Sequence, residues 1–209
     1  MSESMQTQVE TFKEKAALVA AQVSEAANLE EALRRVVRIC EEREPCELLV
    51  PEPGTETVFG ENRRPIRLRR VIAAPGLSDQ EFAMLQKEAD TRGFLCLREG
   101  LRGYLAGIDV GVAWADSAVA ASGTCLVPST NEDVRLATMI CESSVLLLRK
   151  STVKPDLAGI AGQLREMQNT GEPGYAAFIT GPSRTADIER VLTLGVHGPL
   201  ESHVILLEG

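Results

Sequence analysis

The stretch YAAFITGPSRTADIERVLTLGVHGPLESHVILL, from Tyr175 to Leu207, places two apolar runs on either side of a polar segment. The runs Tyr175 to Thr180 and His203 to Leu207 have the length and composition of buried strands. The segment from Thr185 to Leu194 between them is a predicted helix. This order of strand, helix and strand is typical of an α/β protein.

The same alternation extends toward the N-terminus. Ser78 followed by Glu81 has the spacing of a capping box and predicts a helix that runs to about Arg92. Further predicted helices are Asn131 to Thr138 and Pro155 to Met167, and further predicted strands are Cys46 to Val50, Val71 to Ala74, Gly93 to Leu97 and Val145 to Leu148. We therefore expect an α/β fold with a sheet that is mostly parallel at its centre.

The first 43 residues are predicted to form a helical hairpin that precedes this fold. A stripe at three- and four-residue steps predicts a helix over about residues 5 to 25, through Val9, Phe12, Ala16, Val19 and Val23. Asn28, with Glu31 three positions on, is a predicted N-cap for a second helix, whose apolar face is Leu29, Leu33, Val36, Val37 and Cys40. The hairpin is either a homo-oligomerisation or docking element or a helix pair packed on its own domain, and we favour packing. The predicted division is a hairpin at 1–43 and an α/β domain at 44–209.

The composition argues against several classes of function. The 209 residues carry a net charge of −8 and only 4% aromatic residues, which argues against a nucleic-acid binder. No apolar run approaches the ~18 residues of a membrane span. Five cysteines without a Cys-x-x-Cys pair, and only two histidines, fit no zinc or iron–sulfur pattern. We expect a cytoplasmic protein with reduced thiols, no metal site and no cofactor of its own.

Two segments carry candidate binding residues. The predicted turn from strand to helix near residue 181 would place main-chain N–H groups, hydroxyls and a guanidinium at a helix N-terminus, which favours an anion. Its candidate ligands are Gly181, Ser183, Arg184 and Thr185, together with His197 and Gly198 of the following loop. The alternative is that Ser183 or Thr185 only caps the helix.

A second segment is the small-residue run from Gly107 to Val127, where Ser122, Gly123 and Thr124 predict a tight turn between strands. An arginine cluster at 63, 64, 67, 69 and 70 would either receive an anion or an acidic partner, or form a solvated strand edge.

The block from Ile179 to Glu189, followed by Leu194 to Pro199 and His203 to Leu207, resembles the end of the LUD domain family. The resemblance extends less closely back to about Leu68. It implies a Rossmann-like sheet with helices on both faces, similar to the ribose-phosphate isomerase and coenzyme A transferase superfamily. It also implies a role in oxidising L-lactate to pyruvate beside partner subunits that carry iron–sulfur clusters.

The chain departs from the family pattern at two chemically important places. Where the family usually has Glu-Thr-Gly-Thr, this chain has Ala121-Ser122-Gly123-Thr124, so the carboxylate that related coenzyme A transferases use as a nucleophile is missing. A histidine that the family often carries after the Arg135 segment is also missing; the chain has Cys141, Glu142 and Ser144 in that region. Both losses remove candidates for a base or nucleophile.

Two hypotheses follow. We favour an accessory protein of lactate utilization that binds a small anionic ligand or an iron–sulfur partner subunit and has no activity alone. The alternative is a coenzyme A transferase-like or isomerase-like enzyme that acts on a small carboxylate or phosphate. Gly123, Thr124 and Arg135 are further candidate ligands under either hypothesis, and the catalytic candidates of the enzyme are Asp116, Asp187 and His197.

Overall fold

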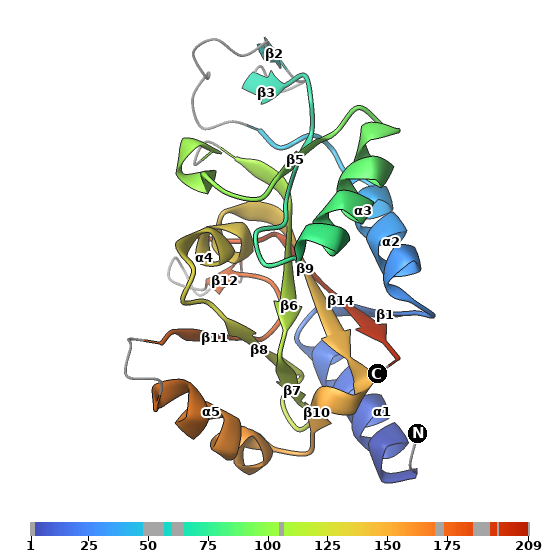
Figure 1. Ribbon diagram of the computed structural model, residues 1–209, viewed down its shortest axis with the longest axis vertical. Helices are drawn as coiled ribbons and strands as arrows, with labels where there is room; N and C mark the ends of the chain where they lie inside the picture. The colour runs from blue at the N-terminus through green and yellow to red at the C-terminus, as the bar shows by residue number, and fades with distance from the viewer. Residues whose placement is uncertain are drawn as a thin grey trace.

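A six-stranded parallel sheet forms the centre of the computed structural model (Figure 1). The structure describes residues 3–47, 57–59, 65–104, 107–169, 174–185, 193–195 and 197–208. In spatial order the strands are β1 (Ala21–Ala26), β14 (Glu201–Leu207), β9 (Cys141–Arg149), β6 (Ile108–Ala115), β4 (Val71–Ala73) and β5 (Leu95–Leu97). Every neighbouring pair is parallel, which confirms the predicted α/β class.

Both faces of this sheet are covered. Successive side chains of a strand point to opposite faces, so each strand contributes to two cores. Val145 and Leu147 of β9 pack in one core with α2 (Leu29–Glu42) and α3 (Asp79–Asp90). Leu146 and Leu148 pack in a second core that includes α1 (Glu3–Leu18). Figure 1 shows α2 and α3 side by side on one side of the sheet, with α4 (Glu132–Met139) on the other.

A smaller four-stranded sheet follows from β6. Its order is β10 (Val153–Lys154), β7 (Ser117–Val119), β8 (Thr124–Pro128) and β11 (Ala176–Ile179). Strand β8 is antiparallel to both β7 and β11. The short helix η3 (Leu157–Ile160) and α5 (Ala161–Gln168) pack against this sheet through Ile160 and Leu164. The turn predicted at Ser122 to Thr124 joins β7 to β8, as expected.

The predicted N-terminal hairpin is wrong. Helix α1 ends at Leu18, and Ala21–Ala26 forms β1, which pairs with β14 at the edge of the main sheet. The chain turns at Ala20, whose φ is 64°. Val19 and Val23 continue the helical spacing only by coincidence. The extended conformation of residues 21–26 is determined by pairing with the distant strand β14. Helix α2 does begin after Asn28, whose side chain accepts a hydrogen bond from Glu31 N at 2.9 Å.

The helix predicted from Thr185 to Leu194 is wrong at both ends. Arg184–Thr185 is strand β12, which pairs antiparallel with β13 (Thr193–Leu194). Residues 186–192 lie outside the described residues. The strand predicted from Cys46 to Val50 is present only as a bridge from Glu47 to Ile66, and residues 48–50 lie outside the described part. Ile66 itself belongs to β3 (Pro65–Arg67), the antiparallel partner of β2 (Thr57–Phe59).

Candidate functional site

Some of the predicted ligands meet near the C-terminal end of α1. The hydroxyl of Thr124 lies 2.7 Å from that of Ser122 and 2.8 Å from that of Thr180, and we call these three residues the hydroxyl cluster. Thr124 is buried, whereas Ser122 and Thr180 are exposed. Thr180 was not a predicted ligand, and the only sequence signal for it is its position before Gly181. The cluster therefore links the β7–β8 turn to the loop after β11.

The last turns of α1 pack closely on both of these loops. A Cβ on Gly123 would lie 2.4 Å from Ala16 N, and one on Gly181 would lie 2.1 Å from Val19 O. Both glycines also have left-handed φ values, of 65° and 69°. Arg184 Nη2 donates a hydrogen bond to Val19 O at 2.8 Å. These two glycines and the arginine therefore contact the protein's own main chain.

The helix N-terminus that was predicted to bind an anion is not formed at Thr185, because that residue belongs to β12. Ser183 N instead donates to Pro199 O at 2.9 Å, and Gly195 N donates to Ser183 O at 2.9 Å. Gly198 lies against Ser183, since a Cβ there would be 3.1 Å from Ser183 Cβ. His197 is exposed in the same loop. Asp187 lies outside the described residues.

The remaining predicted residues, Arg135 and Asp116, have other partners. Arg135 Nη1 donates to Ser129 O at 2.5 Å and to Thr130 O at 2.8 Å, and its guanidinium lies 5.3 Å from the centre of the Tyr175 ring. Partial burial raises the pKa of the Asp116 carboxyl, and a 3.5 Å hydrogen bond from Gln163 Nε2 offsets only part of this effect. Within the described residues, no hydrogen bond or ion pair joins Asp116 or Arg135 to Arg184 or His197.

The arginine cluster also binds main-chain carbonyl oxygens, through the two side chains that the structure describes. Arg69 donates to Gly93 O at 3.1 Å and to Phe94 O at 3.2 Å, while Arg70 donates to the carbonyl oxygens of Cys40 and Glu41. Arg63 and Arg64, and the side chain of Arg67, lie outside the described part of the chain. The two described side chains thus hold α2, β4 and the start of β5 together.

A cluster of polar side chains that was not predicted from the sequence lies at the amino ends of β9 and β14. Arg43 Nη1 is 2.6 Å from Glu201 Oε1, His203 Nε2 is 3.0 Å from Glu201 Oε2, and Ser143 Oγ is 3.5 Å from the same oxygen. Burial disfavours the charged carboxylate, but hydrogen bonds from His203 and Arg43 outweigh it and lower the pKa of Glu201. The available signal was the i, i+2 spacing of Glu201 and His203, which places both on one face of a strand.

Asp109 lies close by, at the amino end of β6, and is only 6% exposed. Its carboxylate accepts hydrogen bonds from Cys46 N and Val71 N, each at 2.7 Å. Cys46 Sγ lies 3.5 Å from Glu142 Oε1. Asp109 therefore fixes the segment that enters β4 and the segment that follows α2.

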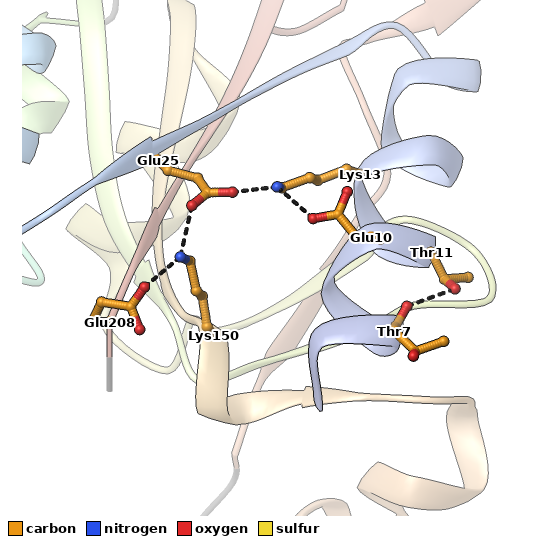
Figure 2. A network of polar contacts seen from close by, with 7 residues as sticks. All are labelled: Thr7, Glu10, Thr11, Lys13, Glu25, Lys150 and Glu208. Atoms are coloured by element: carbon orange, nitrogen blue, oxygen red, sulfur yellow. Dashed lines mark hydrogen bonds and ion pairs between the residues drawn. The ribbon is translucent and has the colours of Figure 1, made fainter. Parts of the chain in front are cut away.

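The carboxyl edge of the sheet carries an ionic network of Lys13, Glu25, Lys150 and Glu208 (Figure 2). The buried Lys150 places Nζ 2.7 Å from Glu25 Oε2 and 2.5 Å from Glu208 Oε1, and Lys13 pairs with the other oxygen of Glu25. Hydrogen bonds from Lys13 and Lys150 lower the pKa of Glu25. Hydrogen bonds to Glu208 and Glu25 raise the pKa of Lys150. The network ties α1 and β1 to the ends of β9 and β14.

Four of the described cysteines have thiols of low reactivity. Burial raises the pKa of Cys40, Cys96, Cys125 and Cys141 to about 12, so little thiolate is present near neutral pH. Among the described residues no group of three His, Cys, Asp or Glu side chains has the geometry to hold a metal ion. None of the helices that the structure describes has the length and hydropathy of a membrane span.

Comparisons with known proteins agree with an α/β protein of this architecture. The crystal structure of a DUF162 family protein from Deinococcus radiodurans shares the fold, with a TM-score of 0.54 over 99% of both chains at 15% identity. The sequence model of the LUD domain matches residues 9–207, so the chain belongs to the LUD domain family.

Several curated relatives share part of the sequence. Lactate utilization protein C of Geobacillus kaustophilus is 38% identical over 101 residues, which cover 47% of this chain and 42% of that protein. Lactate utilization protein C of Halalkalibacterium halodurans is 35% identical over 102 residues, or 48% and 44% of the two chains. The uncharacterized protein YkgG of Escherichia coli is 38% identical over 101 residues, or 47% and 44%. The chain thus spans less than half the length of these relatives.

Proposed function

We propose that this protein is an accessory component of a lactate utilization system, which binds an iron–sulfur partner subunit or a small anion and does not itself oxidise lactate. Membership of the LUD domain family and relatives named lactate utilization protein C support the pathway. The accessory role rests mainly on one observation. The arginines that an enzyme of this kind would use on an anionic substrate are engaged with main-chain carbonyl oxygens of the protein itself.

The geometry of the hydroxyl cluster supports the anion-binding part of the proposal. Ser122 and Thr180 are exposed beside the buried Thr124, and Arg184, in the following strand β12, is exposed as well. A carboxylate or phosphate that accepted hydrogen bonds from these groups would have to compete with Val19 O for Arg184. A hydrogen bond from a charged group contributes about 1.5 to 3 kcal/mol net, and a charge-assisted hydrogen bond from Arg184 to the anion would offset its loss.

Reconstitution tests the accessory role. Iron–sulfur subunits purified from the native source should oxidise L-lactate faster when this protein is added, and they should retain it on an affinity column. The protein alone should give no pyruvate. An acyl-transfer assay with the protein alone, using acetyl-coenzyme A and lactate, should also be negative. Turnover there that is lost in Asp116→Asn would replace the accessory role with the coenzyme A transferase-like alternative, for which the raised pKa of Asp116 is the supporting observation.

Replacement of Arg184 and His197 by alanine tests the anion site. We expect at least tenfold weaker binding of lactate or inorganic phosphate, measured by calorimetry, because the one guanidinium near the hydroxyl cluster among the described residues is removed. The melting temperature should change little, since both side chains are exposed. Lys87→Ala on α3 is the control and should bind like the parent protein. Unchanged affinity in the double variant would exclude these residues as ligands.

A further inference from the structure

Strand β11 has one edge with which no strand among the described residues pairs, and this edge has an unusual composition. It pairs with β8 on one side and ends the four-stranded sheet on the other. Residues 174–183 contain no charged side chain, although the chain as a whole has a net charge of −8. Exposed edge strands of monomeric proteins usually carry charges, proline or a bulge that prevents pairing with another chain. The four residues of β11 carry none of these.

Apolar side chains are exposed along the same edge. Tyr175 is 58% exposed and Phe178 is 47% exposed. A groove of about 240 Å³ lies beside them, lined by Leu164, Met167, Gly174, Ala176 and Phe178. Ala176 and Phe178 both line the groove, so they share the face of the small sheet that α5 covers. Figure 1 shows β11 at the periphery of the molecule, next to α5.

The hydrogen-bonding direction of β11 is fixed by its neighbour. Ser129 N donates to Tyr175 O at 2.8 Å on the side of β8. Main-chain groups alternate in direction along a strand, so those of Ala177 and Ile179 also face β8. The N–H and C=O groups of Ala176 and Phe178 therefore point away from β8, on the side where no described strand pairs with β11.

We propose that β11 is a homodimer interface at which two copies of this chain pair antiparallel about a two-fold axis through Phe178. Residues that face each other across such an axis share a face of the sheet, and Phe178 meets this condition with Phe178 of the second copy. The outward N–H and C=O of Phe178 then form a reciprocal hydrogen-bonded pair, and Ala176 lies opposite Thr180 of the second copy. The uncharged segment lets two acidic chains approach without placing carboxylates opposite each other.

Phe178→Lys tests this proposal, because it places two like charges opposite each other at the axis. By analytical ultracentrifugation, the parent protein should have twice the mass of one chain, and the variant should dissociate at least tenfold more readily. Leu18→Lys is the matched control: Leu18 is 76% exposed on α1, and its variant should stay dimeric. Circular dichroism melts establish that both variants are folded.

Hydrogen exchange of the parent protein provides a second test that needs no variant. The amides of Ala176 and Phe178 should exchange at least tenfold more slowly at high protein concentration than at low concentration, while the amide of Ala177 should show no such dependence. A parent protein that is monomeric at hundreds of micromolar, or a Phe178→Lys variant that is folded and still dimeric, overturns the proposal. Concentration-independent exchange at both amides also overturns it.

Discussion

Single arginines in this protein connect distant segments through main-chain carbonyl oxygens. Arg184 reaches Val19 across 165 positions of sequence, and Arg70, the residue before β4, reaches the end of α2. A guanidinium carries five N–H donors, so it satisfies carbonyl groups at loop and helix ends that have no regular partner. In the sequence such residues look like anion ligands, because a charge pattern does not reveal the carbonyl that each side chain will meet.

Asp109 gives a prediction at the residue scale. Asp109→Ala leaves the buried N–H groups of Cys46 and Val71 without acceptors, and we expect a loss of about 3 kcal/mol in the free energy of unfolding. Asp133 is the matched control. It also accepts two main-chain hydrogen bonds, from Gly100 and Leu101, but it is partly exposed, so water can replace it. Urea unfolding of Asp133→Ala should show a loss of about 1 kcal/mol or less; equal losses would contradict the role of burial.

At the scale of elements, the features that could be predicted are those that depend on residues close together in the sequence. The caps at Asn28 and Ser78 were predictable because each binds a residue three positions away. Strand β1 was not, since its partner is the distant β14 and Val23 continues the apolar spacing of α1. The helix predicted to begin at Thr185 was wrong for a related reason. Its turn was identified from Gly181 and Ser183, but the sequence could not show that β13 would pair with Arg184 and Thr185.

The contact between α4 and β6 gives a prediction at this scale. A Cβ on Gly111 would lie 1.8 Å from Ala137 O, so Gly111→Ala must push α4 away from the sheet. We expect a loss of at least about 3 kcal/mol in the free energy of unfolding, measured by urea titration. Gly103→Ala is the control, because no atom lies within 4 Å of the position that its added methyl group would take. A Gly111→Ala protein as stable as this control would show that α4 is not held where the structure has it.

The ionic network gives a prediction for the whole molecule, because it joins both ends of the described chain. Lys150→Met keeps the apolar stem but removes the charge, and should lower stability by about 1 kcal/mol at neutral pH. Glu25 has a lowered pKa, so its contribution is complete above its ordinary value of 4.5 and is lost as the pH falls through the lower folded value. Lys150 has a raised pKa, so its contribution is complete below 10.5 and is lost as the pH rises above it.

The stability difference between the parent protein and Lys150→Met should therefore be constant from about pH 5 to 10 and should shrink on both sides. Thermal melts across this range measure it. High salt at pH 7 should also reduce the difference, since Glu25 and Glu208 are partly exposed. A difference that stays constant as the pH falls below about 4 would show that the charge of Lys150 is not the source.

The position of β14 has a consequence for how the chain folds. Because β14 lies between β1 and β9, the first strand has no neighbour in the main sheet until the last strand is in place. On a ribosome, residues 21–26 emerge early but must wait for residues 201–207 to leave the exit tunnel before they can pair. During translation the edge of β9 that pairs with β14 therefore remains uncovered until then, and a chaperone would have to protect it.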